Sequence, residues 1–352
     1  MLTTIVACIV VLVILILAHE LGHFVTAKLS KVRVEEFGIG FPPRLASVRW
    51  GETRYSLNAI PLGGFVRMAG EEDPGTPGSL ASKSIPTRLL VLSAGSMMNL
   101  LLPFLLFSIA FMVPHQTVMG QVVVEAVAPN SPAAAAGIEA GDIFLEINGK
   151  AVRSAGDITR QIYINLGKRF TAKIEHSDST TEEVSLTARW KPPEGQGAVG
   201  VAVRTVNPTP VTQHHPFWQA IPLGVVRTWE TFILFKNGII SMFIGALPVE
   251  LAGPVGIAQL TGEVARAGIR PLLEFAAFLS INLGILNILP IPAFDGGRVV
   301  FVLLELARRG KRVAPSTERL IHTIGFVLLI AALIAITYND IMRFIAGRSL
   351  AP

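Results

Sequence analysis

Residues 4–29 read TIVACIVVLVILILAHELGHFVTAKL, a long apolar run that leads into two histidines and a glutamate. Residues 4–18 carry no charge. With the residues that follow, the run reaches about 26 residues, and a helix needs roughly 20 to cross a bilayer. No basic residue precedes the run and no small-residue cleavage site follows it, so we interpret it as a retained membrane span rather than a signal peptide.

The composition of the whole chain agrees with a membrane protein. The chain has 352 residues, of which 51% are hydrophobic and 16% charged, and its mean hydropathy is +0.55. Ordinary soluble domains are less apolar. The net charge is +5 without a long basic tract, so we expect no nucleic-acid partner. The one cysteine, Cys8, excludes a disulfide within the chain.

Three further apolar runs predict spans at 89–113, 272–291 and 321–337. The loops between the first two spans and between the last two are rich in Lys and Arg, which indicates that they face the cytoplasm. The long middle segment and both termini then lie outside. Residues 217–247 are amphipathic, and we expect them to form a helix at the membrane interface rather than a fifth span.

The middle segment contains a compact domain, predicted at 116–206. Its signature is SPAAAAGIEAGDIFLEING at 131–149, which predicts a strand and a turn at Asn148-Gly149. A helical stretch and two strand-like runs, at 170–176 and 183–189, follow. This order resembles a PDZ domain of the circularly permuted bacterial kind, which implies a groove that binds an extended peptide by strand addition. The alternative is a β-rich spacer without a ligand.

The ionisable residues of the first span point to metal chemistry. His19 and His23 are four residues apart, so they share one face of a helix. Two imidazoles one turn apart can hold the same zinc ion. Glu20, next to the first histidine, is placed to act on a metal-bound water. The alternative is a chance match or a pair of hydrogen-bonded core histidines.

A third ligand has near and far candidates. Glu35 and Glu36 follow the first span closely, whereas Asp295 lies in NILPIPAFDGG at 287–297. An acidic side chain at the end of an apolar, proline-broken helix is typical of a functional site, and the glycines after it allow close approach of the backbone. The predicted orientation places Asp295 at the same cytoplasmic side as the two histidines.

Together these motifs resemble the site-2 proteases, a family of intramembrane zinc metalloproteases, and most closely the bacterial regulator-of-sigma-E-protease type with a single PDZ domain. Further matching stretches are YSLNAIPLGGFVRMAGEE at 55–72, GSMMNL at 95–100 and GPVGIAQLTGE at 253–263. The resemblance implies one Zn²⁺ per chain on His19, His23 and Asp295, with Glu20 as catalytic base. It also implies a substrate-handling role for Asn287 and a shaping role for three residues of the same motif: Pro290, Pro292 and Gly296.

The resemblance also implies the substrate and the compartment. The substrates would be single-span membrane proteins, such as anti-sigma factors after a first trimming cut, or remnant signal peptides. The enzyme would be a multi-pass protein of the bacterial inner membrane, in contact with lipid. The alternative function is a membrane scaffold whose PDZ domain collects partners around an inert metal site. A transporter is disfavoured because four spans show no internal repeat.

A helical substrate must be unwound before it is cut, and a sheet edge can supply the replacement hydrogen bonds. ASVRWGETRYSLNAI at 46–60 predicts a hairpin with its turn at Gly51-Glu52. The preceding EFGIGF allows close backbone approach at Gly38, Ile39 and Gly40. We therefore expect these three residues to form a free edge that binds substrate. A purely structural hairpin is the alternative.

The predicted fold class is a polytopic α-helical membrane protein with about four spans, a membrane-associated β-hairpin and one inserted extracytoplasmic PDZ-like α+β domain. The predicted organisation has four parts: an N-terminal membrane core at 1–115, the PDZ-like domain at 116–206, an interfacial helix with linker at 207–270, and a C-terminal membrane core at 271–352.

Overall fold

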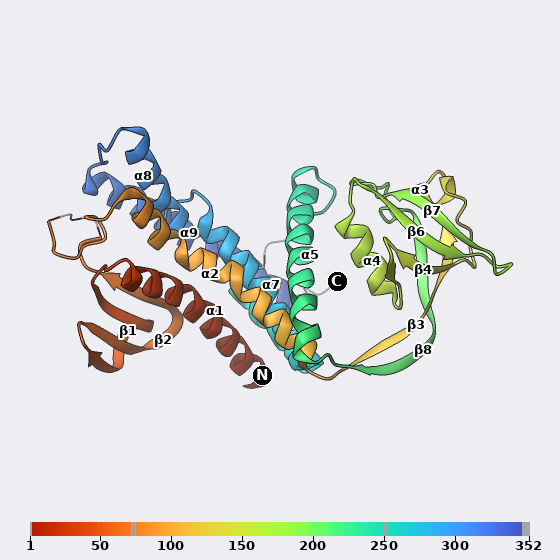
Figure 1. Ribbon diagram of the computed structural model, residues 1–352, viewed down its shortest axis with the longest axis horizontal. Coiled ribbons are helices and arrows are strands. Elements are labelled where there is room, and N and C mark those ends of the chain that lie inside the picture. The colour runs from red at the N-terminus through yellow and green to blue at the C-terminus, as the bar shows by residue number, and fades with distance from the viewer. Residues whose placement is uncertain (1, 72, 74, 249–251, 347–352) are drawn as a thin grey trace. The chain divides into compact units, whose positions relative to one another are not determined.

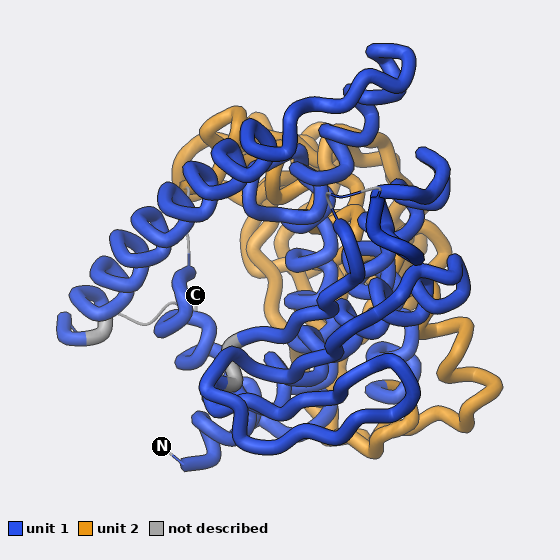
Figure 2. Tube along the Cα trace, turned by 90° about the vertical axis from the view of Figure 1, so that its left-hand side faces the viewer, with its two compact units in different colours: residues 1–110, 251–352 blue, residues 111–250 orange. Residues whose placement is uncertain are grey.

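The structure is a computed structural model that describes residues 2–71, 73, 75–248 and 252–346. The chain forms two compact units, coloured separately in Figure 2. Unit 1 combines Met1–Ala110 with Leu251–Pro352, and unit 2 is Phe111–Glu250. The first unit is thus built from both ends of the sequence, and the second is inserted between them.

Four helices of the described chain are long and apolar enough to cross a membrane, which confirms the predicted number of such segments. They are α1 (Leu2–Leu29), α2 (Ile85–Met112), α7 (Ile269–Ile288) and α9 (Pro315–Ile345). Each helix begins a few residues before the apolar run that predicted it. The hydropathy pattern locates the apolar centre of each helix but not its first residues. Helix ends are therefore predicted less well than helix centres.

Helices α1, α2 and α7 pack around a shared apolar core. Its buried members are Val11, Leu15, Leu106, Phe107, Ala276 and Ala277. Between helices in lipid the hydrophobic effect contributes little, so close packing and small residues decide the association. Gly22 shows this at the contact of α1 with α2: a Cβ built there would lie 2.3 Å from the carbonyl oxygen of Ala94.

A further helix, α6 (Pro254–Ala267), belongs to this same unit. It packs against α1, where Gly262 meets Thr4. Its first turn is capped by the buried Asp340 of α9, whose Oδ2 accepts the N–H of Gly256 at 2.8 Å. The sequence interpretation had placed this segment in a linker at 207–270. The proline at the first helical position was the available signal for the helix start.

Strands β1 (Val34–Trp50) and β2 (Thr53–Met68) form a hairpin that packs beside α1 (Figure 1). The turn falls at Gly51 and Glu52, as predicted, and Gly51 has a φ of 61°. The hairpin is longer than the predicted 46–60 segment, because β1 already starts at Val34.

Each of these two strands is bent, so four segments lie side by side in the order 44–50, 53–60, 34–41 and 64–68. Gly38 pairs with Ser56 on one side and with Phe65 on the other, and Ile39 pairs with Leu57 and with Gly64. A segment with neighbours on both sides has no free row of N–H and C=O groups. The expected free edge at Gly38–Gly40 is therefore wrong. In the described sheet, the outer segments are 44–50 and 64–68.

Unit 2 is built on a six-stranded sheet with the order β7-β6-β4-β3-β8, and β5 pairs with β4. The strands are β3 (His115–Val127), β4 (Ile143–Ile147), β5 (Lys150–Ala151), β6 (Arg169–Glu175), β7 (Thr181–Thr187) and β8 (Val201–Gln213). The predicted turn is confirmed, with a φ of 49° at Asn148 and 72° at Gly149. The predicted strands near 170–176 and 183–189 correspond to β6 and β7.

Helices α3 (Pro132–Ala135) and α4 (Ala155–Ile164) complete the domain, and α5 (Phe217–Phe243) packs against α4. Glu230 of α5 pairs with Arg160 of α4 at 3.0 Å. Asn237 donates from Nδ2 to the carbonyl oxygen of Tyr163 at 2.7 Å, which caps the end of α4. Because of these contacts, the compact unit extends past residue 206 to Glu250.

Candidate metal centre

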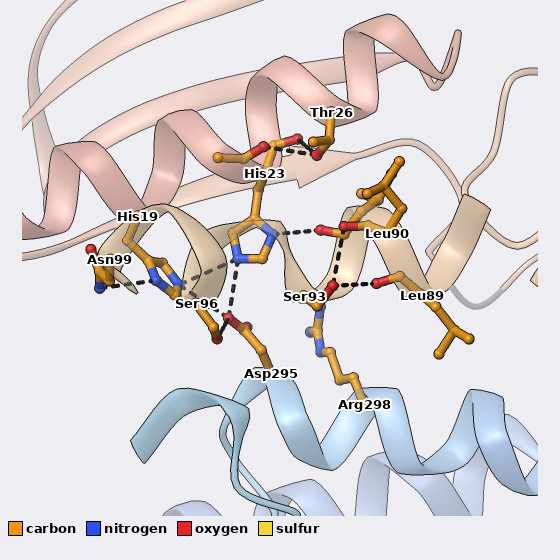
Figure 3. A network of polar contacts seen from close by, with 12 residues as sticks. His19, His23, Thr26, Leu89, Leu90, Ser93, Ser96, Asn99, Asp295 and Arg298 are labelled. Atoms are coloured by element: carbon orange, nitrogen blue, oxygen red, sulfur yellow. Dashed lines mark hydrogen bonds and ion pairs between the residues drawn. The ribbon is translucent and has the colours of Figure 1, made fainter. Parts of the chain in front are cut away.

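Two elements distant in sequence bring three potential ligands together. His19 and His23 lie one turn apart on α1, and both rings point toward Asp295 (Figure 3). Asp295 is the first residue of α8 (Asp295–Ala307), where the positive end of the helix dipole favours a carboxylate. Its Oδ2 lies 3.1 Å from Nε2 of His19 and 3.2 Å from Nε2 of His23. The two Nε2 atoms are 3.3 Å apart.

These separations fit a zinc ion. Ligand atoms 2.0–2.1 Å from one ion in tetrahedral geometry lie about 3.3 Å from one another. The two Nε2 atoms face each other at 3.3 Å, and both face the Asp295 carboxylate. Protons on the nitrogens cannot give all three atoms good hydrogen bonds at the same time. A cation between them can bind all three. Within the described residues, the same three side chains form the group of His, Cys, Asp or Glu close enough to hold a metal.

The near candidates for the third ligand lie elsewhere in ion pairs. Glu35 pairs with Arg33 at 2.9 Å, and Glu36 pairs with Arg44 at 2.8 Å. Burial alone would raise the pKa of Glu36, but Ser56 and the guanidinium groups of Arg44 and Arg67 together outweigh this effect and hold the pKa below its ordinary value. The geometry therefore favours Asp295 over both glutamates.

Helix α2 supplies contacts behind the three side chains. Nδ1 of His23 donates to the carbonyl oxygen of Val91 at 2.8 Å, which leaves the lone pair of Nε2 free for a metal. Ser96 donates from Oγ to Oδ2 of Asp295 at 3.4 Å. Such contacts fix ring orientation and tautomer, and they are as much part of a metal site as the ligands.

Gly95 allows α2 to approach the two imidazoles. A Cβ built at this position would lie 2.3 Å from Nε2 of His23 and 2.7 Å from Nε2 of His19. These are the two atoms that face the metal position, so a side chain at Gly95 would enter the site itself. The glycine of GSMMNL is thus required by the close approach of α2 to α1.

The three side chains open onto a cavity of about 420 Å³. Glu20 lines it, together with the outer sheet segment 64–68 and with Arg298 of α8. Gly64 lies directly against Glu20, since a Cβ there would be 2.8 Å from the Glu20 Cγ. The Glu20 carboxylate, the three potential metal ligands and the strand segment 64–68 therefore line the same cavity.

The other predicted substrate residues lie at the return from α7 to α8. Asn287 is in the last turn of α7, and Pro290 and Pro292 lie in the connecting loop. Gly296 is buried, and a Cβ there would lie 2.1 Å from the carbonyl oxygen of Leu289, so the chain can fold back only with glycine. Among the described residues that line the metal-side cavity, Asn287, Pro290 and Pro292 are not found.

The sequence interpretation missed the contribution of α2 and of the outer strand segment. Val91, Gly95, Ser96 and Asn99 all contact the potential ligands. The stretch GSMMNL was noted as a motif, but no role followed from it. Residues 64–68 were part of another noted stretch, and their place at a sheet edge depends on pairing between distant segments.

Comparisons with known proteins agree with this geometry. Residues 7–332 match the family described as Peptidase family M50. The chain is 36% identical over 337 residues to a putative zinc metalloprotease of Clostridium perfringens, with 93% of this chain and 95% of that protein covered. It is 28% identical over 427 residues to the regulator of sigma-W protease RasP of Bacillus subtilis, with 97% and 98% covered.

Solved structures are also similar to part of the chain. One of them is the PDZ domain of an SdrC-like protein from Listeria monocytogenes, 25% identical, and the match covers 25% of this chain and 90% of that domain, with a TM-score of 0.22. The family match spans most of the sequence, including His19, His23 and Asp295. The chain therefore belongs to peptidase family M50, and it is a zinc metalloprotease.

Proposed function

We propose that the protein cleaves peptide bonds of single-span membrane proteins within or near the membrane, at one zinc ion held by His19, His23 and Asp295. The observation that carries this proposal is the convergence of three ligand atoms within 3.1–3.3 Å of one another. Two of these atoms belong to α1, a helix long and apolar enough to cross a membrane. When bound, zinc acts as a Lewis acid and makes its water a nucleophile at neutral pH.

Glu20 is the general base of the proposed reaction. It lines the same cavity as the ligands without belonging to the converging group. Its carboxylate takes the proton of the attacking water and passes it to the leaving amine. His19, His23 and Asp295 would hold the ion as three protein ligands, which is the number found in catalytic zinc sites.

The substrate is held by the outer sheet segment 64–68. This segment lines the metal-side cavity and has a paired neighbour on one side, the segment 34–41. A substrate unwound from its helix would add as a strand to the other side and regain its backbone hydrogen bonds. Gly38 and Ile39 then support this edge through their pairing with Phe65 and Gly64. Asn287 contacts the substrate from the last turn of α7, and Pro290, Pro292 and Gly296 shape the return from α7 to α8.

The name of one relative supports the substrate class. One relative is named a regulator of sigma-W protease, which supports anti-sigma-factor-like substrates, and remnant signal peptides have the same single-span chemistry. The protein would lie among the lipids of the inner membrane with both termini outside.

In unit 2, β8 is the last strand of the sheet, and α4 lies against it. The N–H of Ala155 donates to Oγ1 of Thr205 at 3.2 Å. A peptide would bind as a PDZ ligand along this edge.

A reconstituted system tests the proposal. The purified chain is placed in liposomes with a single-span substrate, and the products are identified by mass spectrometry. We expect a cut inside the apolar span that stops on removal of zinc by a chelator and returns on re-addition. A cut confined to the water-exposed flanks, or a cut that does not depend on zinc, would refute it. The absence of any cut would favour the scaffold with an inert metal site.

A further inference from the structure

Helix α2 presents one regular face to the two histidines. Val91, Gly95 and Asn99 are spaced four residues apart, so they form a single stripe along the helix. Val91 contacts His23, and Gly95 lies against both imidazoles. Asn99 contacts His19 (Figure 3). In this stripe Val91 and Asn99 each contact one histidine of α1, and Gly95 lies between them.

The two histidines differ in the partner of their Nδ1 atoms. Nδ1 of His23 has a carbonyl oxygen at 2.8 Å, which can accept only from a protonated Nδ1. Nδ1 of His19 has the Asn99 carboxamide at 3.4 Å, with the amide nitrogen, a donor, facing it. In this orientation His19 must carry its proton on Nε2, the atom that faces Asp295 at 3.1 Å. An imidazole with a protonated Nε2 cannot bind a metal through that atom.

The carboxamide of Asn99 has an unused acceptor. Its side chain belongs to a residue that is 1% exposed, and within the described chain Oδ1 has no hydrogen-bond donor. A half-turn about the Cβ–Cγ bond exchanges oxygen and nitrogen with almost no change of shape. Oδ1 then faces Nδ1 of His19 and accepts a hydrogen bond from its N–H. Nε2 is left with a lone pair that points at the metal position.

We propose that Asn99 is a positioning residue that selects the metal-binding tautomer of His19 through its amide oxygen. The proposal rests on the zinc centre of the proposed function. Val91 does the same for His23 through a backbone carbonyl, which no substitution can remove. Of the two contacts to the Nδ1 atoms, the one made by Asn99 can therefore be tested by a side-chain substitution. Its backbone is held separately, because Ser280 of α7 donates to the Asn99 carbonyl oxygen at 2.7 Å.

Zinc affinity of the full-length protein in detergent, measured by competition with a chelator, tests this role. Asn99→Leu keeps the approximate size but removes the acceptor, and loss of such an outer contact costs about 10- to 100-fold in metal affinity. Asn99→Asp supplies a stronger acceptor, so we expect affinity at least equal to that of the parent. Asn282→Leu is the matched control, since that amide donates to the Phe278 carbonyl on α7, and it should leave zinc affinity unchanged.

A purely structural role gives a different pattern, because a buried carboxylate would then destabilise the site as much as leucine does. A loss below tenfold in Asn99→Leu, or affinity in Asn99→Asp below that of the parent, overturns the proposal. Ring ¹⁵N spectra of the zinc-loaded parent give a second readout that needs no variant. Both histidines should carry the proton on Nδ1, and a His19 that binds zinc through Nδ1 would overturn the proposal.

The same assay separates this proposal from the proposed function. His23→Ala should lose zinc whether or not Asn99 has a role. A parent protein without bound zinc refutes the centre and this proposal together. A parent that binds zinc through His23 but tolerates Asn99→Leu refutes the role of Asn99 alone.

Discussion

Gly95 shows how one residue limits the metal centre. Because glycine has no Cβ, the two imidazoles can lie close to α2 at this position. A Cβ there would lie 2.3 Å from Nε2 of His23. Alanine is the better helix former by about 1 kcal/mol, so helix propensity alone would favour the change. We therefore predict that Gly95→Ala folds but loses most of its zinc, measured as metal per chain by elemental analysis.

Gly238 in α5 is the control for Gly95, because a Cβ there meets no atom of the described structure within 4 Å. Gly238→Ala should leave zinc content unchanged and raise thermal stability slightly. Normal zinc content in purified Gly95→Ala would show that the two helices are farther apart in the loaded protein.

At the residue scale, the sequence predicted the centre only partly. His19, Glu20 and His23 could be identified because one helical turn contains them all. Asp295 required arguments on depth and side of the membrane, and the structure brings it to the histidines. The partners on α2 could not be predicted, because α2 is apolar on most of its surface. Its sequence does not tell which face meets α1.

At the scale of elements, α8 carries Asp295 and is anchored by a buried ion-pair cluster. Glu305 of α8 pairs with Arg88 of α2 at 2.6 Å and with Arg312 at 3.2 Å. Glu305→Gln removes the charge and leaves Arg88, which is 12% exposed, without its carboxylate. Breaking a buried pair in this way costs about 3 kcal/mol. We predict a lower thermal midpoint and weaker zinc binding, measured by calorimetry and by chelator competition.

The same cluster predicts acid sensitivity. Burial raises the pKa of Glu305, but the contacts with Arg88 and Arg312 outweigh it, so the folded-state pKa lies below its ordinary value. The stability that Glu305 contributes is therefore complete above the unfolded pKa, about 4.3, and is lost as the pH falls through the lower folded pKa. The thermal midpoint of the parent should fall on acidification below about pH 4. A Glu305→Gln variant with the same acid dependence would contradict this account.

The outer segment 64–68 gives a prediction about substrate. The N–H of Met68 points away from the neighbouring segment toward Oε1 of Glu71, at 3.2 Å. Backbone alternation along a strand then places the N–H of Val66 on the same outer side. Val66→Pro removes this donor, so cleavage of stable helical substrates should slow strongly, while substrates with helix breakers are spared. Rates on matched substrates measure this.

Val48→Pro is the control for Val66→Pro, because Val48 lies on the other outer segment, 44–50, away from the metal-side cavity. It should cut both substrates at the parent rate. If Val66→Pro retains zinc and cuts stable helices as fast as the parent, the segment 64–68 does not present substrate.

The elements also show what local patterns could not predict. The hairpin turn at Gly51 and Glu52 was predicted because turn residues separate two strand-like runs. The order of the four sheet segments was not, because it depends on which distant segments pair. Helix α6 was taken for a linker, since its amphipathic pattern includes small residues such as Gly256 and Gly262 that are buried against other helices.

For the whole molecule, the distribution of Lys and Arg predicts the topology. Ser177, in the turn between β6 and β7, should face the outside, and Lys311, between α8 and α9, should face the cytoplasm. In a Cys8→Ala background, we predict that Ser177→Cys reacts with a membrane-impermeant maleimide on intact cells. Lys311→Cys should react only after permeabilisation. Labelling of Lys311→Cys on intact cells would invert the orientation.

In the proposed reaction, Glu20 acts as general base at a zinc ion held by His19, His23 and Asp295. The most direct measurement compares bound zinc and cleavage of a single-span substrate in the parent, Glu20→Gln and His23→Ala. His23→Ala should lose both. Glu20→Gln should keep about one zinc per chain while cleavage falls about 10²- to 10⁴-fold, the usual contribution of a general base. Cleavage at the parent rate by Glu20→Gln, or loss of its zinc, would contradict the account.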